Sequence, residues 1–207
     1  MSKMSFHPLR RALGAFRRNK NGVAAVEFAY IAPLLILALF GTVEVSRAVM
    51  MHKRFQRVSA MIGDLVSREQ TIGTAAGTAA PILNGMMLSA KEVMYPFSTS
   101  SLEVNVNSLR AKSDDKTQTK AEWSYSSTNQ STASTCTIKA MPAADMISAG
   151  NTAIVVESKY KFSPLLANLI PGFRTSMTWT DTITHSPRKA SCVAYEGKNC
   201  GELCPTW

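Results

Sequence analysis

The sequence predicts an α+β protein with a long amino-terminal helix, a second short helix and a small antiparallel β-sheet head. Three observations support this. An apolar segment lies near the amino end, apolar residues recur at helical spacing over 47–68 and 80–94, and β-branched and aromatic residues dominate after residue 98. At 207 residues the chain has room for one modest domain beside a membrane segment.

The apolar segment predicts a membrane span. Phe28–Val43 is 16 residues without a charge, and Val23–Val45 extends it to 23 residues. At about 1.5 Å per residue this helix crosses a ~30 Å hydrocarbon core, with Glu27 and Glu44 near the interfaces or neutralised. A cleaved secretory signal would need a small-x-small site after the segment, and charged residues occupy that place. We therefore expect an anchor.

The charge distribution predicts the orientation. The formal charge is +9, and residues 1–22 hold six cations and no acid, which leaves 9 − 6 = +3 for the remainder. The basic amino end favours the cytoplasm under the positive-inside rule, although Arg47, Lys53, Arg54 and Arg57 weaken the argument. Because the remaining charge is mild and scattered, no nucleic-acid partner is expected.

All four cysteines follow the apolar segment, which fits an oxidising compartment on the far side of the membrane. An even count predicts two disulfides with three open connectivities, while free buried thiols stay as the alternative. No second Cys/His pair completes a tetrahedral zinc site, so no metal is expected. The disulfide candidates are Cys136, Cys192, Cys200 and Cys204.

The head begins with helical patterns. From Arg47 to about Arg68 an apolar stripe at three- and four-residue spacing predicts a helix that packs on the head. A Gly/Thr/Ala-rich loop over Ile72–Ala80 leads to a second helix, Ala80–Met94, with Pro81 in its first turn. The stripe consists of Phe55, Val58, Ile62, Leu65 and Val66.

Strand patterns follow. Alternation predicts strands over 102–106 and 121–125 around a polar loop, Lys112–Thr119, and the Ser/Thr-rich stretch Ser126–Ser134 predicts a surface loop. Stronger strands are expected at Thr152–Phe162 and Arg174–Thr184. The apolar connector Leu165–Ile170 is either an exposed patch or a buried short helix. The tail after Pro187 is expected to be a stapled loop on the sheet.

No enzyme is predicted. The three histidines are His7, His52 and His185, and their positions in leader, membrane-proximal helix and strand end keep them from sharing a site. The sequence has no glycine-rich phosphate loop, nucleophile elbow or metal-ligand spacing. Asp114-Asp115 is interpreted as solvated charge in a loop rather than as a pair of catalytic carboxylates. We therefore nominate no catalytic residue and no cofactor.

The string NGVAAVEFAY resembles the processing site of type IV prepilins and pseudopilins. The resemblance implies that a membrane-bound prepilin peptidase cuts between Gly22 and Val23, with Phe28 following the key carboxylate. Glu27 would become the fifth residue of the mature chain and pair with the terminal ammonium of a neighbouring subunit, because a charge in an apolar bundle persists when it is paired. The alternative places Glu27 in the lipid headgroups.

The longer frame AAVEFAYIAPLLILALFGTVEVSRA resembles the amino-terminal signature of the TadE/TadG-like family of the tight-adherence (Flp) pilus system. Residues 100–186 resemble it loosely. The resemblance implies a pilin-like fold, and the lack of room for a larger extra domain favours the TadE-like branch. The matching positions are Glu27, Phe28, Ala29, Pro33, Leu34, Gly41 and Glu44.

The resemblance implies a minor pilin-like subunit or assembly factor for a Flp-type pilus. The expected partners are inner-membrane lipid, the prepilin peptidase, and other pilus subunits and assembly proteins. The protein would be a single-pass inner-membrane protein with a cytoplasmic amino end and a periplasmic head, with incorporation in the pilus left open. The alternatives are an uncleaved bitopic periplasmic scaffold of the pilus or secretion apparatus, and an anchored envelope enzyme.

The expected organisation has five parts. They are a cytoplasmic leader (1–22), a transmembrane helix (23–46), a helical region (47–97), a β-rich periplasmic head (98–187) and a cysteine-containing tail (188–207).

Overall fold

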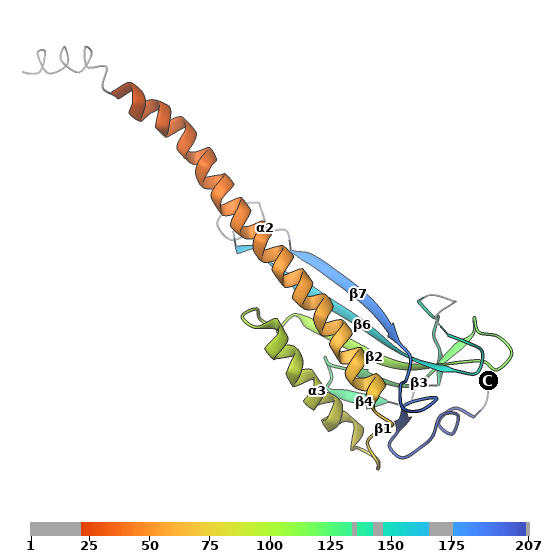
Figure 1. Cartoon of the computed structure of the whole chain (residues 1–207). Helices are drawn as coiled ribbons and strands as arrows, with labels where there is room; N and C mark the ends of the chain where they lie inside the picture. The colour runs from red at the N-terminus through yellow and green to blue at the C-terminus, as the bar shows by residue number, and fades with distance from the viewer. Residues whose placement is uncertain (1–21, 134–135, 143–146, 166–175, 206–207) are drawn as a thin grey trace, which may run out of the picture. The chain divides into compact units, whose positions relative to one another are not determined.

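A computed structural model describes residues 22–133, 136–142, 147–165 and 176–205 (Figure 1). It confirms the α+β class, with a long amino-terminal helix, a second short helix and an antiparallel sheet. The elements are α2 (Val23–Arg68), β1 (Thr71–Ile72), α3 (Ala79–Met94), β2 (Leu102–Ala111), β3 (Thr119–Ser126), β4 (Ser131–Ala133), β5 (Thr137–Ile138), β6 (Thr152–Phe162), β7 (Met177–His185) and β8 (Ala194–Tyr195).

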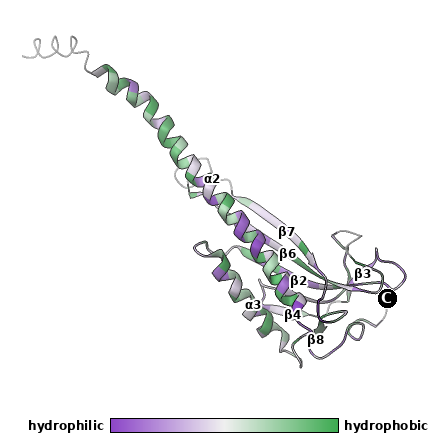
Figure 2. Cartoon of the chain, viewed as in Figure 1, coloured by the Kyte–Doolittle hydropathy of each residue, from purple (hydrophilic) through white to green (hydrophobic). Residues whose placement is uncertain are grey.

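The chain forms two compact units, Met1–Ser46 and Arg47–Trp207, and α2 contributes residues to both. In the first unit the large apolar side chains of α2 are exposed, as Phe28 at 65% and Leu34 at 68% illustrate. Figure 2 shows hydrophobic residues predominating in these turns and hydrophilic ones becoming frequent in later turns. By length and composition α2 could span a membrane.

The helix continues through Pro33. Proline removes one backbone hydrogen bond, a loss that membrane helices tolerate. Two hydroxyl groups in this part of α2 bond to the helix backbone. Thr42 Oγ1 donates to the Leu39 carbonyl and Ser46 Oγ to the Thr42 carbonyl, both at 2.8 Å. These bonds lower the cost of placing hydroxyls in an apolar medium.

The second unit, called the head below, is built on an antiparallel sheet with strand order β4-β3-β2-β6-β7, and β5 also pairs with β3. Opposite residues of antiparallel strands share a face. Val106 lies opposite Tyr125 on β3 and Val156 on β6, and Val156 lies opposite Ile183 on β7. This register gathers apolar side chains on one face of the sheet.

The head's part of α2 packs on that face. Phe55, Val58, Ile62 and Val66 are at most 1% exposed, as the helical stripe predicts, whereas Leu65 is only half-buried. They join one core with side chains of α3 and the central strands, including Leu83, Met94, Val104, Val106, Trp123 and Val156. Each fully buried large apolar side chain contributes roughly 1.5–3 kcal/mol.

Strand β7 is the edge of the sheet. Its threonines at 178, 180 and 182 are exposed, while Trp179, Asp181 and Ile183 are half-buried. Asp181 lies opposite Ser158, and both carry a buried oxygen without a hydrogen-bond partner among the described residues. An acidic side chain therefore points inward from the edge strand.

Two regions differ from the sequence-based expectations. Ser126–Ser134 was predicted to be a loop, but Ser131–Ala133 pairs with β3 as β4, because a short edge strand needs no apolar alternation. The carboxy-terminal tail also supplies a strand, since β8 pairs in parallel with β1. Most of the apolar connector, from residue 166, lies outside the described residues, as do 174 and 175 of the last predicted strand.

Candidate functional site

The junction predicted for cleavage lies at the start of α2. The helix begins at Val23, and Gly22 immediately precedes it. Gly22 is exposed, and no atom lies within 4 Å of the position that a Cβ would occupy. An unencumbered glycine at a scissile bond leaves the backbone accessible to a peptidase.

The remaining signature residues lie along the first unit's part of α2. Val23 and Glu27 are four residues apart and therefore lie on the same side of the helix. Glu27, Phe28, Ala29 and Leu34 are exposed, as is Pro33, whereas Gly41 and Glu44 are partly covered. The surface of this segment is thus a continuous apolar helix with a carboxylate near each end.

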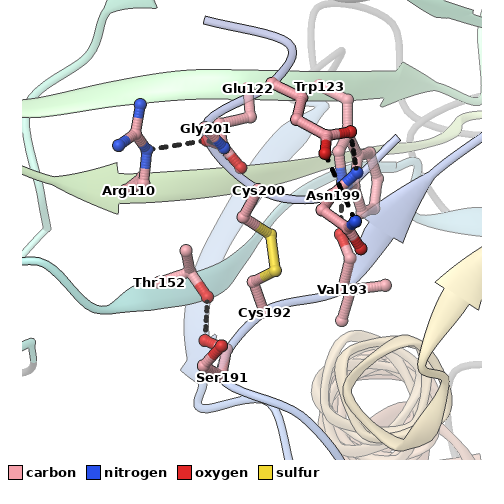
Figure 3. The surroundings of a disulfide bond; sticks show 11 residues. Arg110, Glu122, Trp123, Thr152, Ser191, Cys192, Val193, Asn199, Cys200 and Gly201 are labelled. Carbon is pink, nitrogen blue, oxygen red and sulfur yellow. Dashed lines mark hydrogen bonds and ion pairs between the residues drawn. A yellow bond between two sulfur atoms is a disulfide. The ribbon is translucent and has the colours of Figure 1, made fainter. Parts of the chain in front are cut away.

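The carboxy-terminal tail is fixed to the sheet by one disulfide and by polar bonds, and a second disulfide, drawn in Figure 3, closes a loop within the tail. The two expected disulfides pair Cys136 with Cys204 and Cys192 with Cys200. Trp123 Nε1 donates to the Val193 carbonyl at 3.1 Å, and Thr152 Oγ1 donates to the Ser191 carbonyl at 2.7 Å. The tail therefore covers one end of the sheet.

A buried ion pair lies beneath the tail. Arg110 Nε is 2.7 Å from Glu122 Oε1, and the Glu122 side chain is 1% exposed. The Gly201 N–H donates to the same carboxylate oxygen at 2.7 Å, and Arg110 Nη2 donates to the Cys204 carbonyl at 2.8 Å. Buried charges persist when they are paired and hydrogen-bonded, and here the tail supplies part of that bonding.

His185 lies where β7 meets α2. A Cβ built on Gly63 would collide with the His185 ring and come within 3.2 Å of Val156 Cγ2. Burial lowers the pKa of His185, the Asp64 carboxylate opposes that shift, and Arg188 adds to it. Asp64 itself forms ion pairs with Arg68 at 2.6 Å and with Arg188 at 2.8 Å.

An aromatic group lies at the other end of the sheet. The Trp179 ring centroid is 5.0 Å from His52, 5.1 Å from Phe162 and 6.2 Å from Tyr160. The Phe55 ring is 6.1 Å from Tyr160. These contacts fix the first head turns of α2 against the paired ends of β6 and β7.

A recess of about 610 Å³ lies between α3 and the β2–β3 hairpin. Tyr125 Oη donates to Asn84 Oδ1 at 2.7 Å across it, and burial raises the pKa of Tyr125. Its lining contains Met87, Leu88 and Leu102 but no histidine, cysteine or aspartate. Within the described residues, no group of three His, Cys, Asp or Glu side chains is placed to hold a metal.

Comparison with protein families decides what the amino-terminal helix is. Residues 22–64 match the family described as TadE-like protein. This segment is similar to TadE-like proteins. The match confirms the predicted resemblance over these residues, and the family takes part in Tad pilus assembly. No curated protein and no solved structure matches the chain.

The TadE-like match crosses from the first unit into the head. It starts at Gly22 and ends at Asp64, so it covers the apolar run and most of the stripe that packs on the sheet. The predicted site residues are therefore of two kinds. Those from Gly22 to Glu44 lie in one helical stretch, whereas the four cysteines lie in the head.

Sequence reasoning missed Arg110, Glu122 and Trp179. Arg110 and Glu122 occupy neighbouring strands, and their tail partners are 94 and 79 residues away along the chain, respectively. Glu122, within the predicted strand 121–125, was the available signal, since a charge predicted inside a sheet calls for a partner; Arg110 lay beyond the predicted strand 102–106. The position of Trp179 in a Thr-rich strand gave a similar signal for packing.

Proposed function

We propose that this chain is a minor pilin-like subunit or assembly factor of a Flp-type pilus, anchored through the first half of α2. The observation that carries the proposal is the TadE-like match over residues 22–64, which takes in the glycine, the apolar run and the first turns that pack on the head. The helix that could span a membrane, Val23–Arg68, begins within the same residues and ends four residues beyond them.

The proposed action is structural. The precursor inserts with its basic amino end in the cytoplasm and its head in the periplasm. A prepilin peptidase then hydrolyses the Gly22–Val23 bond and removes six cations. The new Val23 ammonium and Glu27 of a neighbouring subunit offset each other while the apolar helices pack together. The two disulfides support an oxidising compartment for the head.

The amino-terminal residue of the membrane-extracted protein tests cleavage. Intact mass and terminal sequencing are compared in strains with and without the prepilin peptidase. We expect a chain that starts at Val23, and a full-length chain when the peptidase is absent. Gly22→Leu should also retain the leader, whereas Gly14→Leu, a glycine change within the leader, should leave cleavage intact.

A chain that keeps its leader in both strains would contradict the pseudopilin role. The same TadE-like segment would then anchor an uncleaved periplasmic scaffold, and Glu27 would be an interfacial carboxylate. A second variant separates cleavage from assembly. The Glu27→Gln protein should be cleaved to start at Val23 yet fail to support pili. Glu92→Gln, at an exposed position of α3, should leave both cleavage and pilus formation intact.

A further inference from the structure

Four segments of the head meet at the end where the head's part of α2 begins (Figure 1). They are residues 47–57, 95–101, 158–165 and 176–180. The His52 ring contacts Trp179, Tyr160 Oη donates to the Ser98 carbonyl at 2.9 Å, and Arg54 Nη1 donates to the Val93 carbonyl at 3.1 Å and to the Tyr95 carbonyl. These contacts make the four segments one surface region.

This region carries an excess of positive charge. The four segments contain six cations and no aspartate or glutamate, while the exposed Glu103 of β2 lies opposite Lys159 of β6. We call the region the basic end; its cations are Arg47, Lys53, Arg54, Arg57, Lys159 and Lys161.

Several of these cations are open to solvent. The side chains of Lys53, Arg57, Lys159 and Lys161 are exposed, and none forms an ion pair within the described part of the chain. Arg54 is engaged with two carbonyl groups and lies over the Phe97 ring.

The opposite end of the head has a different charge arrangement. There Asp64 pairs with Arg68 and Arg188, Arg110 with Glu122, and Lys112 with Asp114. Neutralisation by neighbouring carboxylates is therefore common at that end. Lys159 lies opposite Glu103, but Lys53, Arg57 and Lys161 have no carboxylate in their own segments, so a source of negative charge outside the chain fits these three.

The same four segments carry exposed apolar side chains. The exposed fractions are 48% for Val49, 51% for Met50, 73% for Tyr95, 60% for Leu165 and 46% for Met177. Cations mixed with aromatic and apolar side chains are typical of surfaces at the headgroup level of a bilayer, where long basic side chains reach phosphates while their stems stay in apolar surroundings.

We propose that the basic end binds the anionic phospholipid headgroups of the leaflet from which α2 emerges. The inference rests on the proposed membrane insertion. Arg47 directly follows the first unit, and Lys53 and Arg57 come eight and twelve residues after Val45 in the sequence.

The same proposal accounts for the cations that oppose the predicted orientation. Four of them, Arg47, Lys53, Arg54 and Arg57, follow the span closely. Anionic headgroups on the periplasmic side would hold them there. Once a cleaved leader is gone, this contact would be the main electrostatic attachment of the mature chain to the bilayer.

Lysine footprinting on the full-length protein tests the proposal. The protein is placed in lipid nanodiscs of phosphatidylcholine alone or with phosphatidylglycerol, and lysine acetylation rates are measured by mass spectrometry. Lys53 and Lys161 should be acetylated about threefold to fivefold more slowly with phosphatidylglycerol. Lys189 and Lys198, exposed in the tail, are internal controls and should react equally in both discs. In 0.5 M salt the protection should largely disappear.

Equal acetylation of Lys53 and Lys161 in the two lipids would overturn the proposal. So would the same protection by inorganic phosphate in phosphatidylcholine discs, because it would indicate a free-anion site. Failure of the protein to co-elute with either disc would instead contradict membrane insertion, and thus the proposed function itself.

Charge-matched variants provide a second test. Lys53→Gln/Lys159→Gln/Lys161→Gln should lose the preference for phosphatidylglycerol among lipids retained in native mass spectrometry. Lys116→Gln/Lys189→Gln/Lys198→Gln removes the same charge elsewhere and should keep that preference. An equal loss in both variants would show a general charge effect and overturn the proposal. Circular dichroism melting verifies that both variants are folded.

Discussion

The two ends of the head are built differently. At one end, which we call the stapled end, two disulfides, the tail and the Arg110–Glu122 pair fix the sheet, and charges have partners. At the basic end, aromatic contacts around Trp179 hold the elements together and four exposed cations lack ion pairs within the described residues. The difference indicates that internal electrostatics stabilise one end, while the other presents its charge outward.

One substitution made at both ends tests this comparison most strongly. Arg110→Met leaves Glu122 buried without its cation and should lower the free energy of unfolding by about 3–5 kcal/mol. Arg57→Met removes an exposed cation and should change it by less than about 0.5 kcal/mol. Chemical denaturation of the two variants in the same detergent measures both. Similar losses would show that the basic end is also held by its charges.

The two disulfides should differ in their contribution. The Cys136–Cys204 bridge spans 68 residues and the Cys192–Cys200 bridge spans 8. In the chain-entropy model, removing them with paired alanines costs about 4 and about 2.5 kcal/mol respectively. Thermal melting of each double variant measures the order. An unchanged melting temperature after reduction of both bridges would show that the tail is held by its polar contacts alone.

The effect of Gly63→Ala on the free energy of unfolding should change sign when His185 is removed. Gly63→Ala gains about 1 kcal/mol of helix propensity but collides with the His185 ring, an overpacking cost of about 1–3 kcal/mol. We expect a net loss of up to about 2 kcal/mol. In a His185→Ala background, Gly63→Ala should stabilise by up to about 1 kcal/mol. Denaturation of the four proteins of this cycle measures the coupling, and additive effects would contradict the contact.

The smallest expected effect is a pH dependence at the stapled end. Because burial lowers the pKa of His185, the folded state favours the neutral ring, whereas the unfolded chain takes up a proton near the ordinary value of about 6.5. The contribution of His185 to the free energy of unfolding is fully present above about pH 6.5 and is lost as the pH falls through its lowered folded-state pKa. Melting temperatures from pH 7.5 to 5 should therefore decline.

The decline of the melting temperature between pH 7.5 and 5 should be shallower in the His185→Gln variant than in the wild type. If His185→Gln and the wild type show equal slopes, another group is responsible for the loss.

Local periodicity predicted much of the fold. The stripe from Phe55 to Val66 has helical spacing, and Thr152–Phe162 has the composition of a strand, so α2 and β6 could be predicted from neighbouring residues. Features that depend on distant residues could not. The connectivity of the disulfides, the parallel β1–β8 pair and the carboxylate–tail bond at Glu122 require knowledge of which segments meet.

The candidate site divides in the same way. The segment from Gly22 to Glu44 was predictable because its signature is contiguous, and the family match covers it. The basic end was not, because its cations come from α2 and β6, which are about a hundred residues apart in the sequence. In the sequence alone, the cations from Arg47 to Arg57 only weaken the prediction of the orientation.

The inward-pointing carboxylate of β7, Asp181, affects how neighbouring heads interact when many of them are close together. An edge strand offers its backbone to any strand that approaches, and an inward charge is one device that discourages such pairing. If many heads gather at a pilus base, Asp181 would keep their sheets separate and leave the helices as the surfaces that join. Asp181→Val should then raise the melting temperature of the isolated protein and also shift it toward oligomers in sedimentation, so that the more stable head would be the one more prone to self-association.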